Sequence, residues 1–484
     1  MKGSVWIETA PAAPRFPKLD EDISADVCVI GAGIVGVTAA LVLHDAGARV
    51  VLIDAGRIGH GVTGHTTGKV SSQHGAIYAR LRSKHGADAA RLYGAANEAA
   101  LEWIAERAVD CDFRRRESYV YGPRPEMERE AQAAFDAGLP AALVHDTPLP
   151  YAVDAAVRFD AQAEFHAVKY LLGLLDGLPL IYERTRAVRV GELVRTPGGT
   201  IAAEHTIVAT HFPFPDRSLA FARAHPQRSY AIACRIAGRP PEGMFISSSS
   251  PTRSIRAVPV GESEELLLVG GEGHRTGTGG DTEAHYEALE EFARSHWDVQ
   301  SVEYRWSAQD PTTVDSLPLV GRMTPFEDRV LMATGFGKWG LTGGTAAALV
   351  LADLVLGRPN PYAALFDPNR LNVRASAVPF VRENAPVALR FFGDRLTKRG
   401  SRSLEDLAPD EGDIVSLRGE KVAGYRDPDG RLFAVSCVCT HMGCQVNWNH
   451  AERSWDCPCH GSRFSVDGSV LEGPALHRLE VKPI

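Results

Sequence analysis

The chain has 484 residues, a net charge of −8 and an ordinary apolar content, which allows two or three domains with sizeable cores. The mild negative charge, without any basic stripe, argues against nucleic-acid binding. No apolar run reaches the roughly 18 residues that indicate a membrane span, and residues 1–22 lack the apolar segment of a signal peptide.

The first recognisable unit follows an expected N-terminal arm over residues 1–24. Asp26–Ile30 is short and β-branched, which predicts a buried strand, and Gly31-Ala-Gly33-Ile-Val-Gly36 comes directly after it. A helical pattern then leads to a second predicted strand, Arg49–Ile53, which ends at Asp54. Such glycines allow close approach to a pyrophosphate at a helix N-terminus, and the acid takes a ribose hydroxyl. We therefore expect a dinucleotide site that includes Gly31, Gly33, Gly36 and Asp54.

The middle of the chain alternates amphipathic and β-branched segments, which is typical of an α/β domain with a β-rich insertion. Helices are expected over Ala87–Arg107, Pro125–Ala137, Asp281–Ser295 and Thr345–Leu356, the last opened by the glycine-rich turn Gly335–Gly344. Strands are expected over Thr185–Val190, Ile201–Ala209, Ser254–Val258 and Glu265–Gly270.

Two half-motifs near the C-terminus, Cys439-x-His441 and Cys457-x-x-His460, supply two thiols and two imidazoles. These are the ligands of a Rieske [2Fe-2S] centre, in which sulfur holds one iron and nitrogen the other. A structural zinc site is the competing interpretation. It accounts less well for the Gly461-Ser462 tail and the later Gly473–Ala475 loop. The sequence thus predicts one-electron transfer in this region.

A wider resemblance rests on the motifs above and on three further stretches. The segment from 25 to 365 resembles the D-amino-acid-oxidase and glycine-oxidase superfamily of flavoproteins in its N-terminal glycine fingerprint, in Asp315-Ser-Leu-Pro-Leu-Val-Gly321 and in Ala333-Thr-Gly-Phe-Gly-Lys-Trp-Gly340. With Gly64-His-Thr-Thr-Gly-Lys-Val-Ser-Ser-Gln-His74 and the cluster motif, nearly the whole chain is similar to FAD-dependent oxidoreductases fused to a Rieske domain.

This resemblance implies an α/β fold, with a Rossmann-like FAD-binding domain, an interleaved α+β substrate domain and a C-terminal all-β Rieske domain. The implied FAD-binding parts are about 25–75, 150–215 and 315–365, and the substrate parts are about 76–149 and 216–314. A helical linker over 366–398 and the Rieske domain over 399–484 complete the expected order.

The resemblance also implies how FAD is held. We expect FAD to bind without a covalent bond, because His65–Lys69 and Gly337–Gly340 show no clear match to the relatives that carry covalent flavin. The second glycine turn would direct backbone N–H groups at the N1/C2=O edge of the flavin and stabilise its reduced form. Beyond the first glycine turn and Asp54, the implied contacts are Thr66, Thr67, Val188, Gly335, Gly337, Lys338, Trp339, Gly340, Leu341 and Thr342.

Two residues are candidates for catalysis. Lys69 lies in the loop that the superfamily places against the flavin, where it would activate an acceptor or position water; a solvated loop lysine is the alternative. Glycine-oxidase-like enzymes grip a substrate carboxylate with an arginine where this chain has Gln309-Asp310-Pro311. An acid repels a carboxylate. We therefore expect a cationic or neutral amine substrate with Asp310 as counter-charge, and an exposed acid in a turn before proline is the alternative.

Resemblance to respiratory Rieske proteins implies a disulfide between Cys444 and Cys459, while Cys437 has no assigned partner. Those proteins donate hydrogen bonds to cluster sulfur from a serine and a tyrosine, and this chain has Ser462 but Phe464. We expect a potential within the roughly −150 to +300 mV Rieske range but below the respiratory extreme. The remaining cysteines are scattered, which is typical of a reducing compartment, and predicts a cytoplasmic protein.

Together these features predict a dehydrogenase. An amine-type substrate would give a hydride to FAD, and electrons would leave singly through the cluster to an external acceptor such as a ferredoxin, cytochrome or quinone. Three alternatives stay open: electron flow in reverse from an external donor, an amine oxidase that uses O2, and an electron carrier or redox sensor without metabolite turnover.

Overall fold

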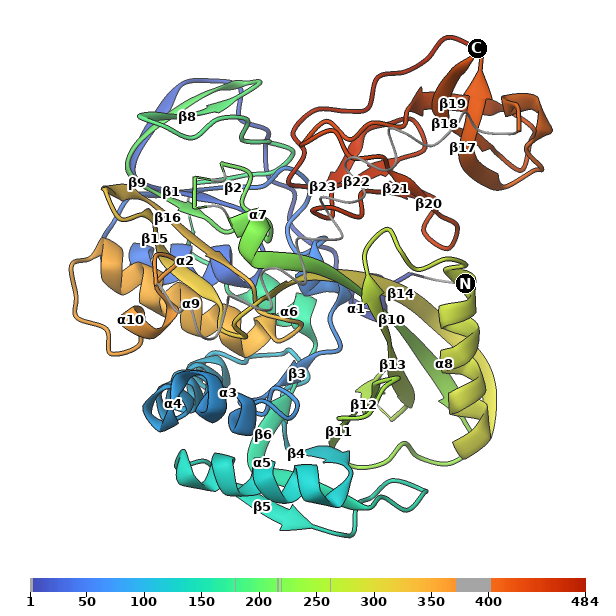
Figure 1. Ribbon diagram of the computed structural model, residues 1–484. Helices are drawn as coiled ribbons and strands as arrows, with labels where there is room; N and C mark the ends of the chain where they lie inside the picture. Colours follow the sequence, from blue (N-terminus) through green and yellow to red (C-terminus); the bar gives the residue numbers. More distant parts are fainter. Residues whose placement is uncertain (1–2, 179, 216, 219, 262, 371–401) are drawn as a thin grey trace.

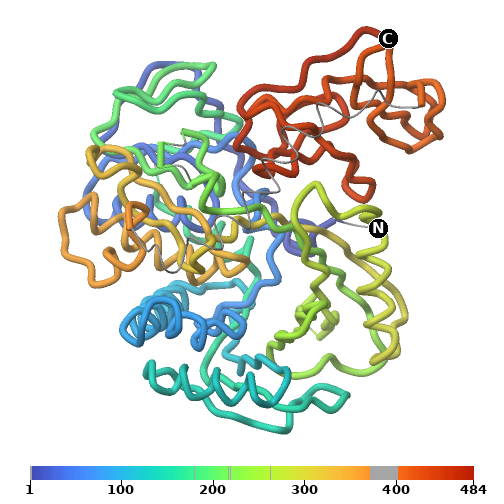
Figure 2. Tube along the Cα trace, viewed as in Figure 1, coloured from blue at the N-terminus to red at the C-terminus, as the bar shows by residue number. Residues whose placement is uncertain are grey.

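The computed structural model describes residues 3–178, 180–215, 217–218, 220–261, 263–370 and 402–484. Two large sheets form the body of the molecule, and a smaller C-terminal domain sits over one end of them (Figure 1). Figure 2 shows this red C-terminal domain beside the yellow-green loop that follows strand β13. Most of the expected linker, residues 371–398, lies outside the described residues. The sheets confirm the expected fold class.

A sheet of seven described strands carries the Rossmann-like part, in the order β15-β16-β9-β1-β2-β7, with β8 beside β9. The apolar strand β1 pairs in parallel with both neighbours, Val29 lying beside Leu52 and Ile207. Helices α2 and α9 pack on each other and on one face of the sheet. The bounds are β1 Ile23–Ile30, α2 Ile34–Asp45, β2 Val50–Ile53, β7 Ile181–Tyr182, β8 Leu193–Thr196, β9 Gly199–Val208, β15 Leu319–Thr324, β16 Glu327–Thr334, α9 Gly340–Val355 and α10 Ala363–Phe366.

A second sheet of nine described strands runs β14-β10-β13-β12-β11-β4-β6-β3, with β5 beside β6. Its strands are β3 Lys69–Val70, β4 Arg114–Gly122, β5 Ala141–Val144, β6 Ala155–Glu164, β10 Ala224–Ile236, β11 Met244–Ser247, β12 Arg253–Pro259, β13 Glu265–Arg275 and β14 Val299–Thr313. The helices around it are α3 Tyr78–His85, α4 Ala87–Glu106, α5 Arg124–Asp136, α6 Ala167–Gly173, α7 Ala220–Arg223 and α8 Glu283–His296.

The C-terminal domain consists of two small antiparallel sheets. One holds β17 Glu411–Leu417, β18 Glu420–Arg426 and β19 Leu432–Ser436, and the other holds β20 Asn447–Asn449, β21 Ser454–Asp456, β22 Arg463–Ser465 and β23 Val470–Glu472; the short helix η2 covers Leu404–Asp406. Trp455 and Phe464 are fully buried and form much of the small core.

The N-terminal segment packs against the loop expected to touch the flavin. In the short helix α1, Val5–Glu8, the buried Trp6 donates from Nε1 to the carbonyl of Thr66 at 2.6 Å. Helix η1, Val62–His65, precedes this contact. The arm therefore fixes one wall of the cavity described below. In the described part of the chain, no helix combines the length and the apolar character that a bilayer span requires.

Most expected elements are confirmed within a few residues, but three differ. Thr185–Val190 is not a strand, because its amides make only isolated bonds to two separate segments: Thr185 donates to Asp54 O, after β2, at 2.7 Å and Val188 donates to Arg195 O, in β8, at 2.8 Å. The last long helix begins at Gly340 rather than Thr345. The glycines already form its first turn, which the bond from Gly343 N to Trp339 O at 3.0 Å closes. Gly344 also lets α9 approach α2 closely, since a Cβ there would lie 3.0 Å from Val35.

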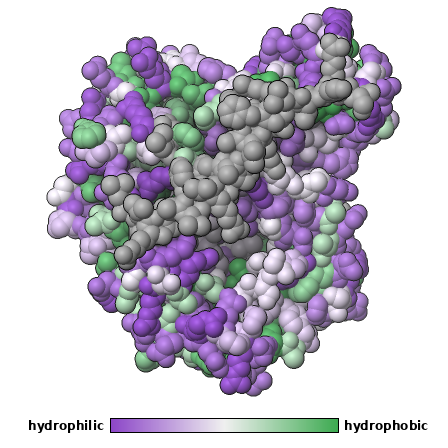
Figure 3. Space-filling model, in the orientation of Figure 1, coloured by the Kyte–Doolittle hydropathy of each residue, from purple (hydrophilic) through white to green (hydrophobic). Residues whose placement is uncertain are grey.

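The third difference concerns the division between the two parts of the flavin domain. β3 and β6 fall in segments expected to be FAD-binding, yet both pair in the nine-stranded sheet. A local pattern can identify a strand but not its partner. Here β6 pairs with β4 and β5, the two strands that precede it in the chain. The face seen in Figure 3 is mainly hydrophilic, with scattered apolar residues.

Candidate functional site

The first glycine turn is tight enough to require glycine. Gly31 has φ +105°, and a Cβ on it would lie 2.4 Å from the carbonyl oxygen of Ala209. A Cβ on Gly36 would lie 1.8 Å from the carbonyl oxygen of Gly31. The turn therefore brings the N-terminus of α2, capped at Gly33, to the edge of a cavity, which is the geometry that suits a pyrophosphate.

Asp54 lies beside this turn, as expected. Its Oδ2 accepts a hydrogen bond from the amide of Ala32 at 2.8 Å, and its Oδ1 accepts one from Gly56 at 2.7 Å. Burial raises the pKa of Asp54, although the two amides act in the opposite direction. The carboxylate is thus held rigidly at the cavity wall.

The cavity has a volume of about 1230 Å³ and runs from the first glycine turn to the C-terminal domain. The sequence-predicted residues that line it are Gly31, Gly33, Asp54, Thr66, Thr67, Lys69, Asp310, Lys338, Trp339, Gly340 and Leu341. Gly36, Val188, Gly335, Gly337 and Thr342 are not among the lining residues. Gly36 and Gly335 shape the turns instead, since a Cβ on Gly335 would lie 2.4 Å from Thr313.

The second glycine turn presents the start of α9 to the cavity. Gly340 and Leu341, the first residues of α9, line the cavity. Thr342 faces the protein, where its hydroxyl donates to Ser71 O at 2.7 Å. The unpaired N–H groups of a helix N-terminus carry partial positive charge, so this end of the cavity suits a group that becomes negative on reduction.

Lys69 is buried on β3 and is not a solvated loop lysine. Its Nζ donates to the carbonyl of Phe245 at 2.5 Å and to the hydroxyl of Ser254 at 2.7 Å. Burial lowers the pKa of Lys69 to about 7, an effect that Arg256 reinforces and Glu164 opposes. The cavity wall therefore contains an amine that changes protonation near neutral pH.

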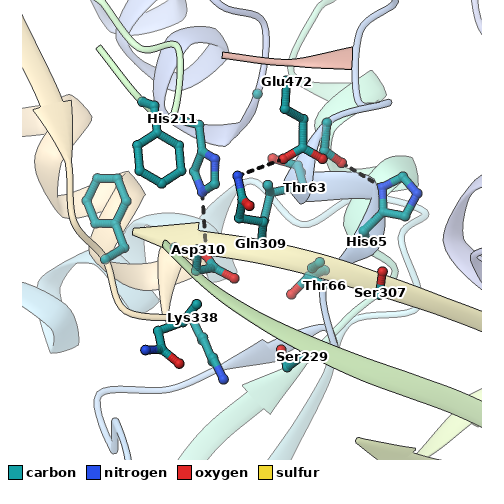
Figure 4. A pocket seen from close by; sticks show the side chains of 18 of the residues that line it. Thr63, His65, Thr66, His211, Ser229, Ser307, Gln309, Asp310, Lys338 and Glu472 are labelled. Atoms are coloured by element: carbon teal, nitrogen blue, oxygen red, sulfur yellow. Dashed lines mark hydrogen bonds and ion pairs between the residues drawn. The ribbon is translucent and has the colours of Figure 1, made fainter. Parts of the chain in front are cut away.

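Asp310 is also buried, on strand β14, where it lies opposite Gln227 of β10. The alternative of an exposed acid in a turn is wrong, because the segment continues as strand through Pro311. His211 Nε2 lies 3.7 Å from Asp310 Oδ1, and Lys338 lies on the other side of Asp310 (Figure 4). Burial lowers the pKa of Lys338, while the charge of Asp310 acts to raise it.

The acid thus has two basic neighbours, and sequence reasoning missed His211. A signal for it existed, since His211 follows β9 at the carboxyl end of the parallel sheet, where ligands of α/β folds bind. Its φ of +63° also marks an unusual backbone.

The four expected cluster ligands converge in the C-terminal domain. The buried thiols of Cys439 and Cys457 hydrogen-bond to each other, which lowers the pKa of Cys439 to about 7. The rings of His441 and His460 lie 5.1 Å apart. Among the described residues, the buried Nδ1 of His460 has no hydrogen-bond partner, and burial lowers the pKa of His460 to about 3. Two close thiols and a neutral imidazole with a free nitrogen fit a Rieske cluster.

A disulfide joins Cys444 and Cys459, the pair implied by resemblance. The sulfur atoms of these two residues and of Cys457 lie within 4.8 Å of one another. Because the disulfide occupies two of them, this trio is not a metal site. Ser462 hydrogen-bonds to Cys439 and accepts from the amide of Ala475 at 3.0 Å, so it is placed beside the cluster ligands.

The two halves of the chain share the cavity. Glu472, Gly473, Pro474, Ala475 and Leu476 of the C-terminal domain line it together with residues of the flavin domain. Gln309 donates from Nε2 to the carbonyl of Gly461 at 2.8 Å and lies next to Asp310 in β14. The cluster loop therefore touches the strand that forms the cavity wall.

Comparisons with known proteins agree with both halves. The family model described as FAD dependent oxidoreductase (DAO) matches residues 26–354, and the model for the Rieske [2Fe-2S] domain matches residues 402–483. A Bacillus subtilis protein named as a Rieske 2Fe-2S iron-sulfur protein, YhfW, is 38% identical over 98% of this chain and 96% of its own length. The gamma-glutamylputrescine oxidoreductase of Escherichia coli is 26% identical, covering 43% of this chain and 53% of its own.

Solved structures share the fold of the flavin half. Glycine oxidase from Geobacillus kaustophilus has a TM-score of 0.58 at 19% identity, covering 72% of this chain and 99% of its own. L-proline dehydrogenase from P. horikoshii has a TM-score of 0.56 at 19% identity, covering 73% and 98%. The chain therefore belongs to the FAD-dependent oxidoreductases, and the same polypeptide carries a Rieske domain with its [2Fe-2S] cluster.

Proposed function

We propose that the chain is a dehydrogenase that oxidises a C–N bond of an amine-type substrate and passes the electrons singly to an external acceptor. FAD supplies hydride acceptance and stepwise electron release when bound, and the cluster carries one electron at a time. For each C–N bond converted to C=N, the substrate loses two electrons and two protons. Two molecules of a ferredoxin or a cytochrome would take one electron each, or one quinone would take both electrons in succession together with two protons.

The observation that carries the proposal is the shared wall between the two redox sites. Gln309 contacts the cluster loop through Gly461, at 2.8 Å, and its neighbour Asp310 lines the cavity. The cavity also contains the glycine turn around Gly31. This arrangement supports direct electron transfer inside one chain.

The cavity's charges support an amine substrate without a strong carboxylate clamp. Asp310 stands where the related oxidases have a carboxylate-binding arginine, and a carboxylate favours a cationic amine. Lys338 and His211 lie around Asp310 and moderate its negative charge, which keeps a neutral amine acceptable as well. Two similar proteins, gamma-glutamylputrescine oxidoreductase and glycine oxidase, are named for substrates that carry an amino group.

We assign Lys69 a role in proton handling. An amine whose pKa lies near 7 is half-charged at neutral pH and can accept or hold a proton. Ser254 and the carbonyl of Phe245 fix its Nζ in place at the cavity wall. Lys69 would therefore position water or a proton during oxidation.

An anaerobic titration with a panel of amines tests the proposal. We expect one class of amine to bleach the flavin absorption and to produce the electron paramagnetic resonance signal of a reduced Rieske cluster. Bleaching without that signal, together with stoichiometric peroxide in air, would mark an O2-using oxidase. Bleaching by no amine would favour a carrier or sensor.

Replacing Asp310 tests the substrate assignment. We expect Asp310→Asn to lower kcat/KM for a cationic amine by about 10-fold or more, since a hydrogen bond to a charged group contributes about 1.5–3 kcal/mol. An unchanged kcat/KM on the identified substrate would remove Asp310 from substrate binding.

A further inference from the structure

Two side chains anchor the Rieske domain to the flavin domain, and they come from opposite sides of the interface. Gln309 belongs to β14 of the flavin domain, and Glu452 belongs to the turn after β20 of the Rieske domain. Both also line the cavity.

Gln309 holds the cluster loop directly. It is fully buried, and its Nε2 donates to Gly461 O at 2.8 Å and to Glu472 Oε2 at 3.2 Å (Figure 4). Gly461 follows the expected ligand His460. With φ +79°, Gly461 packs so closely that a Cβ would lie 2.7 Å from Pro226. The loop and the sheet therefore meet without space between them.

Glu452 inserts a negative charge into the flavin domain. Its Oε1 accepts hydrogen bonds from Ser307 at 2.8 Å and Tyr286 at 3.1 Å, and its Oε2 lies 3.3 Å from Arg228. Burial alone would raise the pKa of Glu452, but Arg228 and Arg463 outweigh it and hold that pKa below its usual range. Glu452 is therefore ionised at neutral pH.

Arg228 makes this contact hard to open. Only 1% of Arg228 is exposed, and its Nε and Nη1 have no hydrogen-bond partner among the described residues. Among the described residues, the carboxylate that forms an ion pair with Arg228 is that of Glu452, which belongs to the other domain. Removing one partner of a buried ion pair is strongly destabilising, because the remaining charge is left uncompensated. Separation of the domains would leave Arg228 in that state.

Additional contacts seat the same loop. The ring of Phe221 meets that of His460 edge-on, with centroids 5.1 Å apart, and Arg275 donates from Nε to Pro458 O at 3.2 Å. His460 thus faces the flavin domain and is only 5% exposed.

We infer that Gln309 and Glu452 are positioning residues that lock the Rieske domain in one fixed place, so that electrons cross between flavin and cluster without domain movement. The inference rests on the proposed function for the direction of electron flow. The docked arrangement itself depends only on the contacts described.

Flash photoreduction of the flavin in the full-length holoprotein tests this inference, because it needs no amine. In the wild type we expect cluster reduction to be first-order, independent of protein concentration and independent of added glycerol viscosity. Transfer that slows in proportion to viscosity would overturn the inference, since it would show a moving domain. This arm requires no variant and is unaffected by a folding failure.

Variants supply the second arm, with a matched control. We expect Glu452→Gln and Gln309→Leu each to slow flavin-to-cluster transfer at least 10-fold, with unchanged g-values of the reduced cluster. Arg453→Met is the control, because exposed Arg453 pairs with Asp410 inside the Rieske domain. Wild-type transfer rates in both test variants would refute the inference.

Amide hydrogen exchange separates this inference from the proposed function. We expect exchange in residues 457–462 to rise at least 10-fold in Glu452→Gln and to stay unchanged in Arg453→Met. Unchanged exchange in Glu452→Gln would contradict a docking role for it. If no amine reduces the flavin but exchange responds as expected, the docking stands and the dehydrogenase assignment fails.

Discussion

The cluster site and the flavin cavity are built in different ways from the same chain. The four proposed cluster ligands lie between Cys439 and His460, on two loops of one small domain. The cavity draws its walls from residues between Ile30 and Leu476, and from both domains. The first site depends on side chains that bind a metal, and the second depends mainly on backbone turns and on the packing of distant strands. Substitutions should therefore damage them differently.

The largest effect should come from a cluster ligand. We expect Cys457→Ser to abolish the cluster, because the alcohol is a poor replacement for a thiolate on iron. Iron content and the visible absorption of the cluster should fall to background, while FAD stays bound to its separate site. Metal analysis and absorption spectra of the purified protein would measure this.

Cys437→Ser is the control for that experiment. Cys437 is buried close to the ligands, but its thiol donates to the carbonyl of Lys421 at 3.6 Å. It should retain full iron. Loss of iron in Cys437→Ser would contradict the ligand set of two cysteines and two histidines.

The flavin side should respond most strongly to a backbone change. We expect Gly36→Ala to prevent FAD retention and to lower the free energy of unfolding by about 1–3 kcal/mol, because its Cβ would lie 1.8 Å from Gly31 O. Bound FAD per chain and urea unfolding would test this. Gly191→Ala, where a Cβ meets nothing within 4 Å, should leave both unchanged. Normal FAD content in Gly36→Ala would argue against the tight turn.

The contrast explains what the sequence could predict. Gly31, Gly36 and Asp54 occur at a spacing that encodes one local geometry, and the strand, turn and helix form as expected. Cluster ligands are equally local, because Cys and His must sit at fixed spacings within two loops. Both predictions needed only neighbours in the chain.

Long-range pairing limited the remaining predictions. Gln309 meets Gly461 across 152 residues, and Lys69 meets Ser254 across 185. No local pattern records such contacts. The same reason accounts for β6, a strand not predicted from the sequence, which joins the nine-stranded sheet through distant partners such as β3. The burial of Asp310 could not be predicted from the local sequence either, since Asp-Pro usually favours a turn.

Lys69 should make the stability of the protein depend on pH. Burial lowers the pKa of Lys69 to about 7, so between pH 7 and about 10 the unfolded chain holds a proton on Lys69 that the folded chain lacks. The unfolded state therefore binds more protons, and stability rises with pH across this window, by up to about 1.4 kcal/mol per pH unit for this group.

The substitution Lys69→Met removes this pH-dependent contribution to the free energy of unfolding. We expect the free energy of unfolding of the wild type, minus that of Lys69→Met, to increase from pH 7 to pH 9 in urea unfolding experiments. A difference that stays constant with pH would show that Lys69 keeps an ordinary pKa. Lys84→Met is the comparison: partial burial also lowers the pKa of Lys84, so its difference should have the same sign but be smaller than that of Lys69→Met.

The last effect concerns the cluster, where we expect one hydrogen bond to contribute to the reduction potential. Ser462 hydrogen-bonds to Cys439, and the donor stabilises the more negative, reduced cluster. We expect Ser462→Ala to lower the reduction potential by about 60–130 mV, since such a bond contributes about 1.5–3 kcal/mol. Phe464→Tyr should raise it, because a tyrosine there would add a second donor. Ser465→Ala is the control, as its hydroxyl faces Asp467. Protein-film voltammetry of the three variants would decide, and equal potentials would exclude hydrogen bonding as the cause.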